Sequence, residues 1–212
     1  MKNIIKRGTS LLLVFAMLLS FAAVVGASGT ELKSKDARVR IWADTAAVPL
    51  NANEDTYIPI YTSVNDPKYG IGALQFNVSC DADAGITIQK VTNWNGYTPA
   101  ATAVGDNNAF SAGNKEEGTQ AELPYWKVGW SRTPDPLDTS AVTCWVVVRA
   151  KSNVDAGGYA IHIDPLNYDT GNAPFRIIKV GDEDITNDKE DHPFENVTLE
   201  DGAAIVYNES EL

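Results

Sequence analysis

One pattern dominates the chain after residue 27: short runs in which apolar and polar residues alternate, separated by turn residues. In Ile71–Cys80, for example, Leu74, Phe76 and Val78 alternate with small or uncharged polar residues. A period of two places the alternate residues on opposite faces of a β-strand, whereas an amphipathic helix needs apolar residues three and four positions apart. Such helical spacing is almost absent. The sequence therefore predicts an all-β fold.

About nine of these runs follow one another without an internal repeat or a long linker. They cover residues 37–44, 56–64, 71–80, 86–91, a short stretch near Phe110, 125–132, 141–151, 159–164 and 203–207. Short strands spaced by turns are typical of a single antiparallel β-sandwich. Pro59 lies inside the second run and cannot donate a ladder hydrogen bond, so it predicts a bulge or a sheet edge there.

The first residues have the organisation of a secretory signal peptide. Lys2, Lys6 and Arg7 precede the apolar run Leu11–Val25, and small residues follow it up to Ala27. An uncleaved membrane anchor needs a longer apolar span, of about 18 to 20 residues. We expect cleavage after Ala27 and a secreted, extracellular protein. The predicted divisions are a signal peptide at 1–27, a linker at 28–36, the sandwich at 37–208 and a tail at 209–212.

The remainder of the chain is strongly acidic. It keeps all 28 acidic residues and 14 of the 17 basic ones, because three basic residues fall in the predicted signal peptide. Such a surface repels nucleic acid and anionic lipid, so neither is an expected partner. The closing residues lack a wall-anchoring signal. We expect a monomer when the protein is free.

The two cysteines are Cys80 and Cys144, both at core-facing positions of predicted strands. Secretion permits a disulfide between them. Buried free thiols are also common, and a domain of this size does not need a covalent staple. We favour two free thiols, and the disulfide stays open.

Residues for catalysis or metal binding are sparse. His162 and His192 are far apart, and we interpret His162 as a surface residue with its hydrogen bonds satisfied. The acidic run Gly181–Asp191 resembles a calcium loop only at its start, because Asn187 stands where glycine is needed and Pro193 where glutamate is needed. A pair of catalytic carboxylates stays open in so acidic a chain. We expect no enzyme, no catalytic residue and no metal ligand.

Two strands place small or polar residues opposite a bulky core face. Trp126, Val128 and Trp130 alternate along the second of these strands and are predicted to lie in the core. The outward sets are Ala73, Gln75 and Asn77 on one strand and Lys127, Gly129 and Ser131 on the other. If these strands are neighbours, they form a flat plateau with few long side chains, and such a plateau loses little entropy on binding. A plain solvated sheet face is the alternative.

Aromatic residues offer a second binding possibility. Exposed rings in a row can stack on sugar rings. Trp94 and Tyr97 stand in the turn-like sequence "NWNGY" and are the candidates for such stacking.

Several stretches, in order, resemble the cohesin domains of cellulosome-type scaffoldins. The runs "TYIPIYTSV" and "YGIGALQFNVSCD" resemble the second and third strands of that family, and "KVGWS" resembles the sixth. The runs "VTCWVVVRAKSNVDAGGYAI" and "VTLEDGAAIVYN" resemble the seventh and eighth strands and the closing strand. The resemblance covers residues 37–207. Two departures are Cys80, where the family has tyrosine, and the long insertion 165–196.

This resemblance implies a nine-stranded antiparallel jelly-roll sandwich without catalytic activity or a cofactor of its own. It implies a dockerin partner that carries calcium and belongs to an enzyme or a scaffoldin. In the family, the third, fifth, sixth and eighth strands form the docking face. The residues carried over are Ala73, Gln75, Asn77, Ser111, Lys127, Gly129, Ser131 and Arg132. A carbohydrate-binding module and a structural adhesin are the alternative functions.

Overall fold

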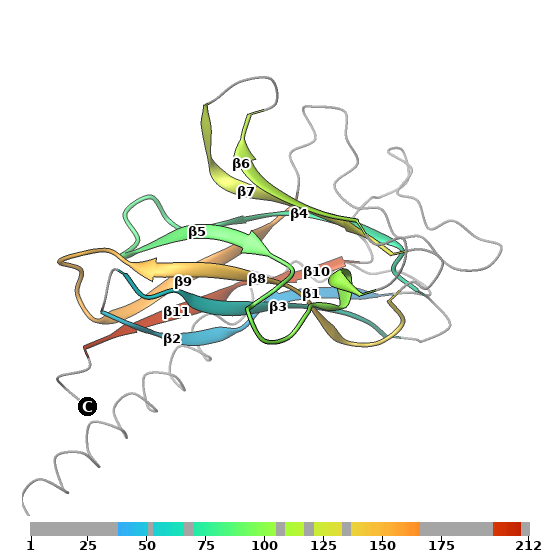
Figure 1. Ribbon diagram of the computed structural model, residues 1–212, viewed down its shortest axis with the longest axis horizontal. Helices are drawn as coiled ribbons and strands as arrows, with labels where there is room; N and C mark the ends of the chain where they lie inside the picture. The colour runs from blue at the N-terminus through green and yellow to red at the C-terminus, as the bar shows by residue number, and fades with distance from the viewer. Residues whose placement is uncertain are drawn as a thin grey trace, which may run out of the picture.

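The computed structural model describes residues 38–50, 53–65, 70–104, 109–116, 121–132, 137–165 and 197–208. Within these ranges the chain forms two packed β-sheets and one short 3₁₀ helix (Figure 1). The predicted all-β sandwich is confirmed. The predicted signal peptide, the acidic run 181–191 and the tail 209–212 lie outside the described residues.

The five-stranded sheet has the order β10-β1-β3-β8-β5, and the six-stranded sheet has the order β2-β11-β9-β4-β7-β6. The elements are β1 (Val39–Ala43), β2 (Thr45–Pro49), β3 (Thr56–Val64), β4 (Ala73–Ser79), β5 (Ile86–Thr92), η1 (Ala101–Ala103), β6 (Ala109–Lys115), β7 (Glu122–Ser131), β8 (Ala141–Ala150), β9 (Gly157–Asp164), β10 (Val197–Glu200) and β11 (Gly202–Tyr207). All nine predicted strands are present. The two additional strands, β2 and β10, have only five and four residues.

Pro59 in β3 lies where the neighbouring strand β1 ends. The last residue of β1, Ala43, pairs with Ile60, and the carbonyl oxygen of Pro59 accepts from Asp44 N–H at 3.0 Å. The N–H and C=O of one strand residue point to the same side, so the missing N–H of Pro59 faces the end of β1 and costs no ladder hydrogen bond. A bulge is also present, but it lies in β8, between the partners of Ile60 and Tyr61.

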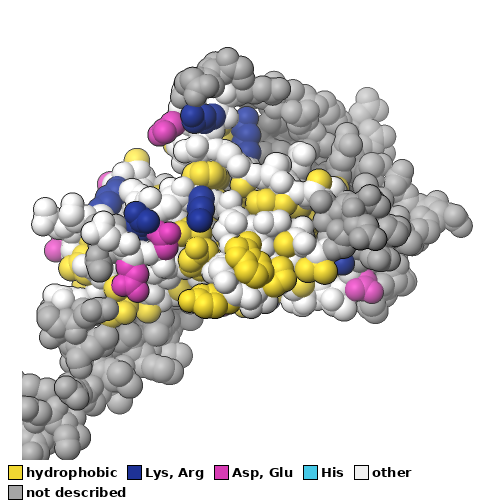
Figure 2. Space-filling model, in the orientation of Figure 1, with side chains coloured by type: hydrophobic (Ala, Val, Ile, Leu, Met, Phe, Trp, Pro, Cys, Tyr) yellow, Lys and Arg dark blue, Asp and Glu magenta, His cyan; other side chains and the backbone are white. Residues whose placement is uncertain are grey.

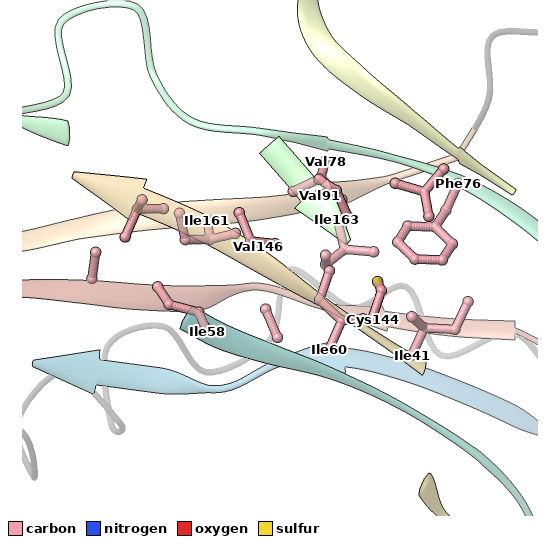
Figure 3. Packing of buried hydrophobic residues seen from close by; sticks show 14 of the residues in the cluster. Ile41, Ile58, Ile60, Phe76, Val78, Val91, Cys144, Val146, Ile161 and Ile163 are labelled. Carbon is pink, nitrogen blue, oxygen red and sulfur yellow. The ribbon is translucent and has the colours of Figure 1, made fainter. Parts of the chain in front are cut away.

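The core lies between the two sheets and consists almost entirely of aliphatic side chains (Figure 3). Ile60 projects from the five-stranded sheet towards Ile163 of the other sheet, and both are buried, as are Ile58 and Phe76. Burying one such side chain stabilises the fold by about 1.5–3 kcal/mol. Trp130, at 3% exposure, also lies in this core, as the alternation in β7 predicts.

The terminal strands cross between the sheets together. β1 pairs in parallel with β10 in one sheet, and β2 pairs in parallel with β11 in the other. The first crossing is at Asp44 and the second at Asp201. Ala203 N–H donates to the carbonyl oxygen of Asp44 at 3.3 Å, so the two crossing segments are in contact. The backbones approach so closely that a Cβ on Gly202 would lie 2.7 Å from the Ala43 Cβ.

The β6–β7 hairpin curls away from the body of the sandwich, at the top of Figure 1. Its pairing shifts register between Gly113, which pairs with Lys127, and Lys115, which pairs with Glu122, so β7 carries three extra residues there. A bulge of this kind bends a strand and increases its twist. The flat part of the six-stranded sheet therefore ends at this bulge.

We predict that Gly202→Ala destabilises the protein by about 1–3 kcal/mol, the usual cost of overpacking. The added methyl group would meet backbone atoms of Ala43 and Asp44, which cannot move aside like a flexible side chain. Urea unfolding measures the loss. Gly157→Ala is the control, because a Cβ there meets nothing within 4 Å. Equal unfolding midpoints for the two variants would contradict the close approach.

Both cysteines are free in the structure. Cys144 is fully buried in the core, and burial raises the pKa of its thiol well above the ordinary range. Cys80 packs against the core, as its core-facing position predicts, but it is only half-buried, so full burial is observed for Cys144 alone. Partial burial still raises the pKa of the Cys80 thiol, with the carboxylate of Asp81 adding to the effect and Lys151 opposing it.

Thiol titration should distinguish these two side chains. In denaturant without reductant we expect two reactive thiols, because the cysteines are unpaired. In the folded protein at pH 8 we expect Cys80 to react slowly and Cys144 not at all, because only the thiolate is nucleophilic and burial disfavours it. Absence of reactive thiols in denaturant would demonstrate a disulfide.

Candidate protein-docking face

The outward residues predicted from sequence come together on one face of the six-stranded sheet. β9, β4, β7 and β6 are consecutive neighbours in that sheet, so the plateau strands do pair. The strand register aligns the residues in three rows across β4, β7 and β6: Ala73–Ser131–Ala109, Gln75–Gly129–Ser111 and Asn77–Lys127–Gly113. Seven of the eight predicted site residues stand in these rows.

The middle row forms the flattest part of this plateau. Gln75 and Ser111 are exposed, and Gly129 lies between them. A Cβ on Gly129 would lie 3.3 Å from Ser111 Oγ and 3.5 Å from Gln75 Cγ, so both side chains lean over the glycine. The row therefore offers one amide group and one hydroxyl group, which lie low over the glycine between them.

Asn77 is not the exposed residue that its outward position predicts. Only 6% of it is exposed. Its Nδ2 donates to the carbonyl oxygen of Pro165 at 3.2 Å, directly after β9, and its Oδ1 has no partner among the described residues. The contact with Pro165 joins residues 88 positions apart. Asn77 is therefore a structural residue at the margin of the plateau, and substituting it would disturb more than a surface.

Arg132 follows β7 and continues the line of the plateau. Its N–H donates to the Gly72 carbonyl oxygen at 2.7 Å, which extends the pairing of β4 with β7 by one residue. The side chain is partly buried, and its Nε has no partner in the described part of the chain. Of the two cationic residues predicted for the site, Lys127 is therefore the more accessible.

β9 adds two residues that the sequence did not assign to this face. Asp164 pairs with Asn77 in the sheet, so it stands in the same row as Lys127. His162 pairs with Ser79, the last residue of β4. Sequence alternation in β9 could have placed both side chains outward, but only the pairing shows which strand lies beside them.

His162 is held between two carboxylates. Its Nδ1 lies 2.8 Å from Asp201 Oδ2, and its Nε2 lies 3.3 Å from Asp81 Oδ1. Partial burial alone lowers the pKa of His162, but the hydrogen bonds and charges of Asp201 and Asp81 together outweigh it, so the pKa is raised. The interpretation of His162 as a satisfied residue is confirmed.

The aromatic candidates stand elsewhere. Trp94 and Tyr97 follow β5, the edge strand of the five-stranded sheet, and do not join the plateau. Among the residues that the structure describes, no three His, Cys, Asp or Glu side chains are grouped to hold a metal ion. The same residues include no helix long and apolar enough to cross a membrane.

No family model matches the chain, and no curated protein matches it closely enough to count as a relative. Solved structures do match. The seventh ScaB type I cohesin from Pseudobacteroides cellulosolvens is similar with a TM-score of 0.53 and 15% identity, over 81% of this chain and 93% of that one. The protein has the cohesin fold. The identity is too low for this likeness to establish more than the fold.

Two further solved structures with the cohesin fold match this chain over nearly the whole of their own length. A cohesin in a type I cohesin–dockerin complex from Clostridium thermocellum matches with a TM-score of 0.51 and 14% identity, over 80% of this chain and 99% of that one. A non-cellulosomal cohesin from the archaeon Archaeoglobus fulgidus matches with a TM-score of 0.50 and 13% identity, over 82% and 94%. The cohesin fold therefore occurs both in a protein bound to a dockerin and in a non-cellulosomal protein.

The carboxylates around His162 predict a pH-dependent contribution to stability. Because the folded-state pKa is raised above the unfolded value of about 6.5, the stabilisation is complete below that value and is lost as the pH rises through the folded-state pKa. We expect the difference in unfolding free energy between wild type and His162→Gln to shrink from pH 5 to pH 9. Curves that run parallel over this range would refute the role of Asp81 and Asp201.

Proposed function

We propose that this protein is a secreted, non-catalytic module that binds the dockerin of an enzyme or a scaffoldin through the β9-β4-β7-β6 face. The observation that carries this proposal is the row Gln75–Gly129–Ser111, in which β4 pairs with the β6–β7 hairpin and the outward residues form one surface of small and polar groups. The cohesin fold supports it, since several proteins with that fold are seen in complex with dockerins. A cellulosome-type polysaccharide-degrading complex is the proposed setting.

The chemistry of the face suits a protein partner. Small side chains on paired strands are already ordered, so binding costs little conformational entropy. Gln75 and Ser111 can donate or accept hydrogen bonds. Lys127 offers an exposed positive charge in the same row as Asp164, which would favour one orientation of a partner with complementary charges.

Calcium would belong to the dockerin rather than to this chain, and the predicted signal peptide would deliver the protein outside the cell. The face itself holds no calcium, although the dockerin that it binds would need calcium. Binding of a calcium-loaded dockerin can be tested with the purified protein, and the location of the protein can be tested by fractionation of cells and medium.

Gln75→Lys tests the binding activity. Gln75 is exposed in the central row, so the substitution should leave the unfolding free energy within about 0.5 kcal/mol of wild type. A long charged side chain there would block contact and lose its hydration without a partner, which should weaken binding by roughly a hundredfold or more. Isothermal titration with a panel of calcium-loaded type I dockerins measures this.

Gln89→Lys is the matched control, since Gln89 is also exposed but lies on β5 of the other sheet. It should bind like wild type. Removing calcium with EDTA should abolish binding through the dockerin without changing the melting temperature of this protein. Dockerin binding that survives Gln75→Lys but not Gln89→Lys would place the interface on the five-stranded sheet and contradict the proposal.

A further inference from the structure

The turn after β5 displays two aromatic rings to solvent. Trp94 is 48% exposed and Tyr97 is 90% exposed. Aromatic side chains provide large apolar surfaces and are normally buried to a considerable extent. We name residues 92–100 the aromatic turn. Two rings this exposed in nine residues indicate a surface that gains by being covered.

Several hydrogen bonds brace the backbone of the aromatic turn. Asn95 Oδ1 accepts from the backbone N–H groups of Tyr97 at 2.9 Å and Thr98 at 2.7 Å. Thr92 Oγ1 accepts from Trp94 N–H at 3.3 Å. Gly96 has a φ of +91°, a conformation that other residues rarely adopt. The rings are therefore presented on an ordered backbone, which reduces the entropy cost of binding.

Further contacts fix the two ends of the turn. Trp94 forms an antiparallel bridge with Pro99, and Ala100 N–H donates to the Asn93 carbonyl oxygen at 2.9 Å. Beyond the turn, Thr102 of η1 is buried and its hydroxyl donates to the Thr143 carbonyl oxygen at 2.6 Å, which anchors η1 to β8. The aromatic turn is thus attached to the sandwich on both sides.

The segment that carries these rings is uncharged. Residues 91–104 include no Asp, Glu, Lys, Arg or His, in a chain with 28 acidic and 17 basic residues. Their polar side chains are amides and hydroxyls. A charged ligand would gain nothing here, whereas a neutral, hydroxyl-rich ligand could stack on the rings and exchange hydrogen bonds with the Asn and Thr side chains.

The aromatic turn and the proposed docking face belong to different sheets. Thr92, the last residue of β5, pairs with Trp145 of β8, which is buried. In the same sheet Trp42 and Tyr61 stack with ring centroids 5.1 Å apart. In Figure 2 hydrophobic side chains gather over β8 and β3. The elements on either side of the turn, β5 and η1, contact β6, so the turn adjoins the β6 edge of the docking face and lies farther from Gln75 on β4.

We propose that the aromatic turn binds a neutral polysaccharide by stacking sugar rings on Trp94 and Tyr97. The protein would then hold a polysaccharide on one sheet and a protein partner on the other. The chemistry points to an uncharged chain of sugars rather than to an acidic glycan, because an acidic glycan would be repelled by the net negative charge of the protein.

Depletion assays with microcrystalline cellulose, insoluble xylan, mannan and starch granules test this proposal on the mature protein. We expect wild type to bind at least one of the four. Trp94→Ala/Tyr97→Ala should weaken that binding by roughly tenfold or more, the usual effect of truncating an anchoring aromatic residue. If the double variant fails to fold, Tyr97→Ala alone replaces it in the same assay, because Tyr97 is the more exposed of the two rings.

Val104→Ala is the control, because Val104 is 53% exposed on the same segment but is not aromatic. It should bind polysaccharide like wild type, and so should Gln75→Lys, which alters only the proposed docking face. Failure of wild type to bind any of the four polysaccharides would overturn the proposal. So would equal losses in the Val104 variant, or a finding that Trp94 and Tyr97 are needed only for capture of a protein.

Discussion

The sandwich depends on the point where its first and last strands cross between the sheets side by side. At Asp44 and Gly202 two backbones come within contact distance, which requires a residue without a side chain at position 202. The crossing closes both sheets with parallel terminal pairs, and Asp201 fastens it to β9 through Ile163 N–H at 3.0 Å and through His162. One local contact thus unites segments from opposite ends of the domain.

Closing the sandwich in this way leaves two outer faces of different character. The six-stranded sheet carries a plateau of small and polar side chains over β4, β7 and β6, centred on Gly129. The outer side of the five-stranded sheet is aromatic, with the stacked pair Trp42–Tyr61 and the exposed Trp94 near β5. Both faces rest on one shared aliphatic core, so each can be altered without the other.

Alternation in the sequence was sufficient to predict nine of the eleven strands and the outward sets on β4 and β7, because side-chain direction follows from a period of two. It could not find β2 and β10, which are too short for a pattern to emerge. It also could not foresee the burial of Asn77, which depends on a contact with Pro165 far along the chain. The role of His162 likewise follows from its carboxylate partners, which lie 39 and 81 positions away.

The central claim is that the β9-β4-β7-β6 face binds a dockerin. Backbone amide chemical shifts of the labelled protein, recorded with and without an unlabelled dockerin that binds it, test this claim most directly. The account predicts shift changes concentrated in residues 73–79, 109–113, 127–132 and 162–164, with little change at Trp42, Tyr61 and Trp94. Changes concentrated on the outer side of β1, β3 and β8 instead would contradict it.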